Sequence, residues 1–154
     1  GATRQLLAAS VVQLLWDGAD PATYLRHISA DPFPNTPPGA ALFAPAKGDP
    51  QVAVVTNEIA ARSNIGIPLM ANYDHQRTPE GIEQAGYPRT GSGVVLYDYG
   101  NPWPKESSNA PPSQDLPDPH GQPKRARHHQ DQMVHFFRTG EIIDVCKSDG
   151  CHPD

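Results

Sequence analysis

Two residues of this chain have the types and positions that proton-transfer chemistry requires: an aspartate, Asp49, and a histidine, His120. Asp49 follows the apolar run 40–46 directly after a Lys-Gly pair, and His120 lies in a long loop before the last segment with helical spacing. A carboxylate can orient an imidazole and stabilise its positive charge, and the imidazole can take a proton from a hydroxyl group. Side chains of these two types can therefore act together in proton transfer where a fold brings them close to each other.

The segments around these residues predict an α/β fold, with a partial parallel sheet flanked by helices. The run 40–46 indicates a buried strand, and the apolar spacing after Asp49 indicates a tight turn and a helix that ends near residue 63. The continuous β-branched and aromatic residues of 93–99 indicate a second strand, buried on both faces. Functional side chains of such sheets lie just beyond the carboxyl ends of strands, which is where Asp49 falls.

The remaining elements are predicted from periodicity, caps and turn residues. Segment 3–16 has apolar residues at helical spacing and is expected to bury one face, and Asp20-Pro21 is expected to begin a short helix. The other expected elements are a short strand at 64–69, a loop at 72–90, a helix from Pro123 to the Gly140 stop, and a β-prone segment at 141–145.

Composition limits the architecture and the partners. The 154 residues include 18 Pro and 13 Gly, which indicates a single α/β domain or domain fragment with long loops, chiefly the Pro-rich loop 100–123 and a tail at 141–154. The net charge of -5 argues against nucleic acid as a partner. No apolar run approaches the roughly 20 residues that cross a bilayer, so no membrane span is expected.

Two cysteines, Cys146 and Cys151, enclose a short loop that contains a glycine. We predict a disulfide between them, and therefore a secreted or periplasmic protein. Free thiols and a zinc site that recruits His152 remain as alternatives. The Cys-x4-Cys-His spacing, Asp74-His75 and 118–120 do not match multi-ligand metal motifs, so we assign no metal and expect no cofactor.

Aromatic residues follow the second predicted strand directly. Tyr99 and Trp103 are placed beside any site at the strand ends, where they are predicted to line a substrate pocket. The alternative for Trp103 is that its ring pins the long loop to the core.

The order of these features resembles the C-terminal part of the α/β-hydrolase fold. In that family the nucleophile, the acid and the histidine follow one another along the chain. Asp49, within 47–52, matches the acid position after the penultimate strand, and His120, within Asp118-Pro119-His120, matches the histidine position after the last strand. The segment 135–140 resembles the end of the family's terminal helix. The resemblance implies a serine hydrolase that acts on ester, amide or lipid-like substrates.

The chain departs from that family because it contains no Gly-x-Ser-x-Gly nucleophile elbow and no oxyanion-hole segment. Without the hydroxyl nothing attacks the substrate, so the chain alone is expected to be catalytically silent. The nucleophile is then expected from a missing N-terminal part of the same polypeptide. That part, or a second copy of the chain, would also cover the open edge of the sheet.

Several alternatives stay open at this point. His129 is the second candidate for the general base, although with His128 it also fits an exposed polar helix face. Asp49 has the alternative role of a helix N-cap, His120 that of an ordinary loop residue, and Asp118 that of a cap or of a group that orients a neighbour. The remaining histidines are His27 and His135, expected as packed or surface residues of helices, with His75 and His152.

The alternative function is a non-catalytic α/β module that binds a partner or a glycan through the loop 100–123. Geometry separates the two hypotheses. A histidine nitrogen within about 3 Å of an Asp49 oxygen favours the enzyme. An Asp49 that only caps its own helix favours the module.

Overall fold

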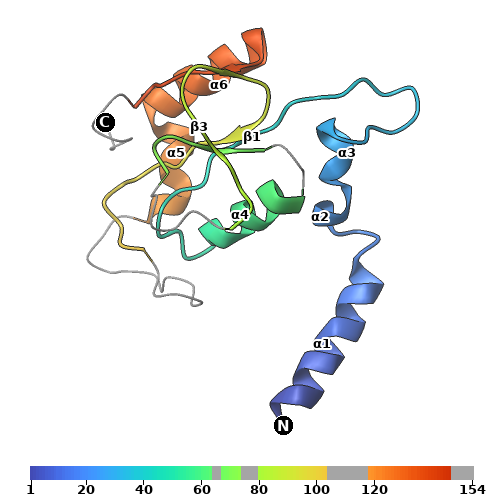
Figure 1. Cartoon of the computed structure of the whole chain (residues 1–154). Helices are drawn as coiled ribbons and strands as arrows, with labels where there is room; N and C mark the ends of the chain where they lie inside the picture. Colours follow the sequence, from blue (N-terminus) through green and yellow to red (C-terminus); the bar gives the residue numbers. More distant parts are fainter. Residues whose placement is uncertain (64–66, 74–79, 104–117, 147–154) are drawn as a thin grey trace.

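The computed structural model of the chain describes residues 1–63, 67–73, 80–103 and 118–146. These residues form an α/β fold, as predicted, with a four-stranded parallel sheet and helices on both of its faces (Figure 1). The sheet has the strand order β1-β5-β2-β3, with strands β1 (Leu42–Phe43), β5 (Gly93–Val94), β2 (Leu69–Met70) and β3 (Gln84–Ala85).

The two strands that were predicted with most residues lie side by side. Leu42 of β1 pairs in parallel with Gly93 of β5, and Phe43 pairs with Val94. The pairing continues beyond the strands, because Tyr97 donates a backbone hydrogen bond to the Pro45 carbonyl at 2.9 Å. Parallel strands run in one direction, so the segments that follow β1 and β5 both leave the sheet at the carboxyl ends of its strands.

Alternating residues of the β5 segment face two different hydrophobic clusters. Val95 and Tyr97 belong to the cluster that contains Phe136, whereas Val94 and Leu96 belong to the cluster that contains Val54. Phe136 lies on α6 (Arg127–Thr139) and Val54 on α4 (Val54–Ser63), so these two helices cover opposite faces of the sheet. Burial on both faces was predicted from the continuous apolar character of 93–99.

Two helices differ from their predicted bounds. Helix α4 begins at Val54, five positions after the predicted Asp49 cap, because the chain bends at 50–52 before the helix starts. The helix predicted from Pro123 is divided into α5 (Gln122–Arg125) and α6, with a 3-10 helix η2 (Pro119–Gly121) before them. Ala126 separates α5 from α6 because its backbone is extended, with φ -69° and ψ 129°. Gly140 ends α6 with φ 70°, as predicted.

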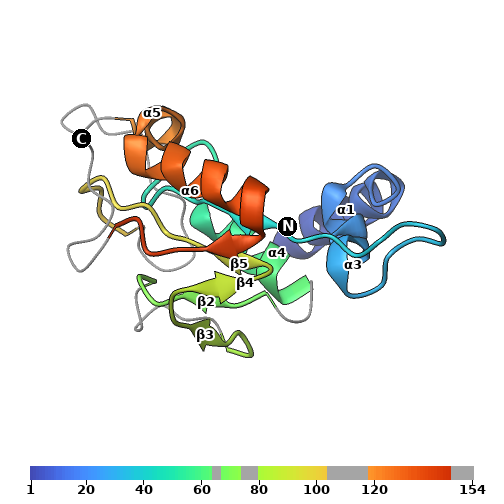
Figure 2. The same cartoon turned by 90° about the horizontal axis from the view of Figure 1, so that it is seen from above.

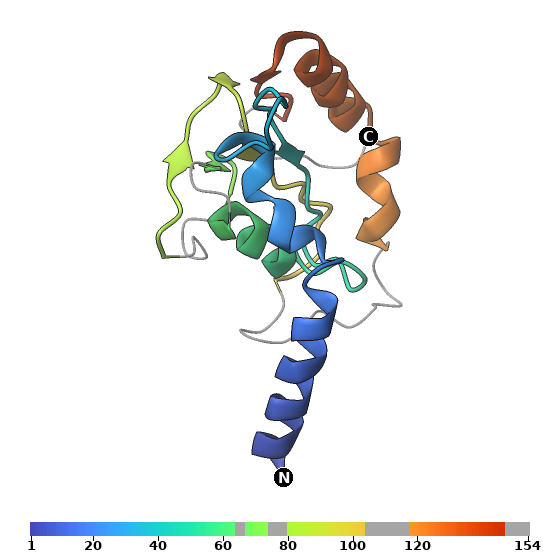
Figure 3. The same ribbon diagram turned by 90° about the vertical axis from the view of Figure 1, so that its right-hand side faces the viewer.

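Helix α1 (Ala2–Trp16) forms as predicted, but the expected burial of one face is wrong. None of its residues is buried, and its large apolar side chains are 58–84% exposed. Figures 1 and 3 show α1 extending away from the rest of the chain. Its apolar residues come in adjacent pairs such as Leu6-Leu7 and Leu14-Leu15, so they point to several sides of the helix instead of forming one stripe.

Two further short helices, α2 (Pro21–Tyr24) and α3 (Arg26–Ser29), follow α1. The N-cap predicted at Asp20 is confirmed, since its carboxylate accepts a hydrogen bond from the Ala22 amide at 2.9 Å. No helix in the described part of the chain is long and apolar enough to cross a membrane.

Three strands depart from the predicted pattern. The strand expected at 64–69 is present only as β2, at Leu69–Met70, and residues 64–66 lie outside the described part. The predicted loop 72–90 contains β3 and also β4 (Arg89–Thr90), which pairs antiparallel with β6 (Glu141–Ile142). Figure 2 shows β4 and β2 on the same side of α6. These strands have two residues each, too few for a detectable alternation of polar and apolar residues.

Candidate functional site

Asp49 and His120 meet beyond the carboxyl ends of the sheet's strands. The Asp49 Oδ2 atom lies 2.9 Å from the His120 Nδ1 atom. Asp49 lies in the turn after the β1 segment and is only 6% exposed, whereas His120, in η2, is half-buried. A carboxylate oxygen only accepts, so Nδ1–H is the donor in this hydrogen bond, and the neutral ring keeps Nε2 as a proton acceptor.

The second oxygen of Asp49 holds its own turn. Oδ1 accepts hydrogen bonds from the backbone amides of Gln51 at 2.8 Å and Val52 at 3.0 Å. The alternative role of Asp49 is therefore partly correct, because the carboxylate caps a turn, although not the start of α4. The same carboxylate thus caps the turn through Oδ1 and bonds to His120 through Oδ2. The cap fixes the direction in which Oδ2 points.

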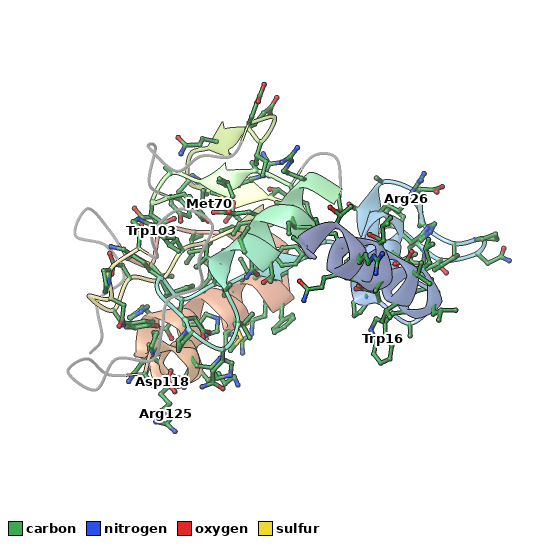
Figure 4. All side chains as sticks on the ribbon, turned by 90° about the horizontal axis from the view of Figure 1, so that it is seen from below. Trp16, Arg26, Met70, Trp103, Asp118 and Arg125 are labelled. Carbon is green, nitrogen blue, oxygen red and sulfur yellow. The ribbon has the colours of Figure 1, made fainter. Side chains whose placement is uncertain are left out.

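Asp118 joins the two turns that carry this pair. Its Oδ1 accepts a hydrogen bond from the His120 backbone amide at 3.0 Å, and its Oδ2 accepts one from the Gln51 side chain at 3.0 Å. Asp118 therefore caps η2 and also connects the His120 turn to the Asp49 turn. Figure 4 shows Asp118 and Arg125 together, well away from Trp16 of α1.

Gly48 permits the close approach that shapes the Asp49 turn. Its φ is +71°, a left-handed conformation that favours glycine. A Cβ atom at this position would lie 2.7 Å from the Asn101 Cβ and 2.8 Å from the Pro102 carbonyl oxygen. The turn before Asp49 therefore packs directly against the backbone that follows the β5 segment.

Replacing Gly48 with alanine is expected to destabilise the fold. Left-handed strain and the two overlaps should together lower the free energy of unfolding by about 2–4 kcal/mol. The matched control is Gly100→Ala, because Gly100 has φ +83° but a Cβ atom added there would have nothing within 4 Å, so strain alone remains. Urea unfolding of both variants measures the difference, and equal losses would show that the overlap at Gly48 is relieved without cost.

A cavity of about 310 Å³ lies beside the pair. Its wall is mostly apolar and comes largely from the β1 segment, with polar groups contributed by Asp49, Asn57, His120, Lys124 and His129. No described residue forms a hydrogen bond with the His120 Nε2 atom. The arrangement can therefore accept a proton from a group bound in or next to this cavity. The lining residues are Leu42, Phe43, Ala44, Pro45, Ala46, Asp49, Val52, Asn57, His120, Pro123, Lys124 and His129.

His129, the second candidate base, lines the same cavity but is bonded elsewhere. Its Nδ1 atom lies 2.7 Å from the Pro123 carbonyl oxygen, and its ring packs edge-on against Tyr97. Burial lowers the pKa of the His129 imidazole; the hydrogen bond to Pro123 raises it, and the neighbouring His128 lowers it further. The structure thus places His120, and not His129, against Asp49.

The lowered pKa of His129 predicts a loss of stability at acid pH. In the unfolded chain the imidazole has its ordinary pKa of about 6.5, and in the fold its pKa is lower. Well above pH 6.5 the ring is neutral in both states. As the pH falls, the unfolded state binds the proton first, so the free energy of unfolding decreases until the pH passes the folded pKa.

This decrease is measured by urea unfolding at about pH 7.5 and about pH 5.5. The His129→Asn variant lacks the titrating ring and should lose less stability between the two values, whereas the control Gln130→Asn, which changes the neighbouring side chain and no titrating group, should lose as much as wild type. An undiminished loss in His129→Asn would assign the pH dependence to another group.

The other histidines have different surroundings. The His27 ring stacks on Phe33 with centroids 4.2 Å apart, and His135 Nε2 lies 3.1 Å from a Glu141 carboxylate oxygen. Both are ordinary helix residues, as expected. His75 and His152 lie outside the described residues.

Tyr99 and Trp103 do not line the cavity at Asp49 and His120. Tyr99 is 5% exposed and belongs to the cluster around Phe136. Trp103 packs against Tyr73, with ring centroids 6.1 Å apart, in a geometry that fits the alternative of a ring that pins the loop. A substrate-binding role for these two residues stays a prediction.

The predicted disulfide falls partly outside the described part of the chain. Cys146 is its last described residue, and Cys151 lies beyond it. The disulfide, and the secreted or periplasmic location inferred from it, therefore stay predictions. Within the described ranges, no group of three or more His, Cys, Asp or Glu residues could hold a metal ion.

Sequence reasoning missed the residues that hold the pair in place. Gln51 joins the turns through its side chain, Gly48 allows the close packing, and the Pro123 carbonyl receives the His129 hydrogen bond. Of these three residues, only Gly48 could have been identified from the sequence, since Gly-Asp after a predicted strand indicates a turn.

Comparison with known proteins adds no assignment, since no protein-family model matches the chain and no curated protein or solved structure is significantly similar to it. The α/β-hydrolase resemblance therefore stays a prediction, and the function is argued from the site alone.

Proposed function

We propose that Asp49 and His120 are the acid and the general base of an α/β-hydrolase-like serine hydrolase that acts on ester, amide or lipid-like substrates. The observation that carries this proposal is the 2.9 Å contact between Asp49 Oδ2 and His120 Nδ1 at the wall of a largely apolar cavity. An apolar cavity with a few polar groups is the usual form of a small-molecule site.

The chemistry of the pair follows from its hydrogen bonds. Asp49 holds the imidazole in the tautomer with the proton on Nδ1, so that Nε2 takes the proton from an attacking hydroxyl and returns it to the leaving group. The carboxylate stabilises the imidazolium that exists between these two steps. Because Asp118 and Gln51 hold both turns in place, the pair needs little reorganisation during the reaction.

The hydroxyl nucleophile would come from a segment outside residues 1–154. The sequence contains no Gly-x-Ser-x-Gly elbow, and no serine or threonine of the described residues lines the cavity. Room for such a segment exists along β1. In the parallel register with β5, the backbone N–H and C=O groups of Leu42 and Ala44 point away from β5, and no described residue bonds to them. An extended segment that paired with this free edge would lie beside His120.

The test uses the natural polypeptide that contains residues 1–154, with p-nitrophenyl butyrate as substrate and a fluorophosphonate probe that reacts with activated serines. We expect hydrolysis, and labelling at a serine outside residues 1–154. His120→Ala should lower the rate by about 10⁶-fold and abolish labelling. The control His135→Ala should retain both, because its imidazole pairs with Glu141 instead.

Labelling that is independent of His120, or an absence of hydrolysis and labelling, would overturn the proposal. The non-catalytic module that binds through the loop 100–123 would then be favoured. That alternative stays a prediction, because residues 104–117 lie outside the described part of the chain.

A further inference from the structure

We propose that His129 is a positioning residue, which holds His120 against Asp49 through the Pro123 carbonyl. The role of His120 in this inference rests on the proposed function, whereas the mechanical link can be tested without any substrate. The contacts that carry it are a helix break, a buried hydrogen bond across that break, and the short distance in sequence from Pro123 to His120.

The break between α5 and α6 removes the helical partners of two carbonyl groups. In an unbroken helix the carbonyls of Pro123 and Lys124 would accept from amides four residues later. The extended backbone of Ala126 prevents this. Each carbonyl is instead bonded by a side chain six residues later in the sequence. His129 Nδ1 lies 2.7 Å from the Pro123 oxygen, and Gln130 Nε2 lies 3.1 Å from the Lys124 oxygen.

The two replacements differ in burial. His129 is 7% exposed and Pro123 is buried, whereas Lys124 and Gln130 are exposed. Water can replace the bond at Lys124, but a buried carbonyl without a partner costs its full desolvation penalty. The His129 ring also packs edge-on against Tyr97, with centroids 4.9 Å apart, so that His129 ties α5 to the segment that continues β5.

The turn that carries His120 depends on such outside contacts. Helix α5 has four residues and η2 has three, and helices this short are not stable by themselves. Asp118 holds the His120 turn from its N-terminal side. The backbone amide of Gln122 bonds to the Pro119 carbonyl, which makes η2 and α5 continuous, so the bond to Pro123 holds the same turn from its C-terminal side.

His129 therefore acts through His120 and not on a substrate directly. Without its hydrogen bond, α5 would lose its buried anchor to α6, and the His120 ring would move away from Asp49 part of the time. The sheet would be affected less, because the β1–β5 pairing does not involve these residues.

The experiment measures the tautomer of His120 by NMR of the imidazole nitrogens in the whole chain. His129→Leu removes the donor and keeps an apolar side chain, and His129→Asn places an amide nitrogen close to the Nδ1 position. We expect His129→Leu to lower the ratio of Asp49-paired to unpaired His120 by about tenfold, as for the loss of one buried hydrogen bond. His129→Asn should restore most of the ratio, and the control Gln130→Leu should leave it unchanged.

Protection of the Val95 and Tyr97 amides from hydrogen exchange, measured in the same samples, reports whether the sheet remains folded. An unchanged His120 signal in His129→Leu, with the sheet folded, would overturn the inference. If His129→Leu does not fold, His129→Asn is compared with His129→Gln, whose longer side chain places its amide nitrogen away from the Nδ1 position. Equal signals in those two variants would also overturn it. A failure of the proposed function looks different, because His120 would then be paired as in wild type while no hydrolysis occurs.

Discussion

The Asp49→Asn variant should lose about 10⁴-fold of the proposed hydrolytic rate while its stability changes by only about 1 kcal/mol. Asparagine keeps an oxygen at the Oδ1 position, so the amides of Gln51 and Val52 retain their acceptor. At the Oδ2 position it presents an amide donor to His120 Nδ1. The imidazole must then carry its proton on Nε2, and it can no longer accept one from a hydroxyl.

Asp49→Ala is the variant that separates the two roles of the carboxylate. It removes the turn cap as well as the partner of His120, and Asp49 is nearly buried, so it should lower the free energy of unfolding by about 2–4 kcal/mol. The measurements are the rate of p-nitrophenyl butyrate hydrolysis by the natural polypeptide, urea unfolding, and the His120 tautomer by NMR. A rate in Asp49→Asn close to that of wild type would show that the pair is structural and not catalytic.

Leu69→Ala should cost about 3–5 kcal/mol, a large part of the stability of an ordinary domain. Leu69 is 0% exposed and lies on β2, which pairs with β5 on one side and β3 on the other. Truncation at this position leaves a cavity between the sheet and the residues of the α4 side, which the strand pairing prevents from closing. Urea unfolding measures the loss, and a cost under about 1 kcal/mol would contradict the placement of this strand in the core.

The same substitution in α1 provides the matched control. Leu15 is 84% exposed, so Leu15→Ala should change the free energy of unfolding by no more than about 0.5 kcal/mol. A larger loss that grows with protein concentration would mean that α1 is covered by a second copy of the chain, one of the two partners predicted from the sequence. A larger loss at every concentration would mean that α1 packs within its own chain, contrary to its exposure.

Local pattern was sufficient for the elements in which one segment carries its own signal. The strand at 93–99 was found because it is apolar on both faces, the cap at Asp20 because it precedes a proline, and the end of α6 because only glycine readily adopts the required φ. The contact between Asp49 and His120 was predicted differently, from an order of elements that resembles the α/β-hydrolase fold. Each residue follows a strand of one parallel sheet, and the ends of such strands share an edge.

Predictions failed where the outcome depends on what lies next to a segment. Apolar spacing in α1 predicted a buried face, but no part of the described chain covers it. The late start of α4 follows from the use of Asp49 by its own turn, and the break at Ala126 accompanies hydrogen bonds from His129 and Gln130 that no helical pattern contains. Strands β3 and β4 are too short for their sequences to show a period.

The sequence by itself determined the α/β class, the two strands that end beside the site, and a short set of candidates there, namely Asp49 with His120 or His129. The tertiary structure alone decided which histidine reaches Asp49, because His120 and His129 both line one cavity, where His120 bonds to Asp49 and His129 bonds to the Pro123 carbonyl. The physical reason is the separation along the chain over which each kind of interaction acts. Helix and strand periods act between neighbours in the chain, whereas a hydrogen bond between residues 49 and 120 exists only after the sheet has brought their turns together.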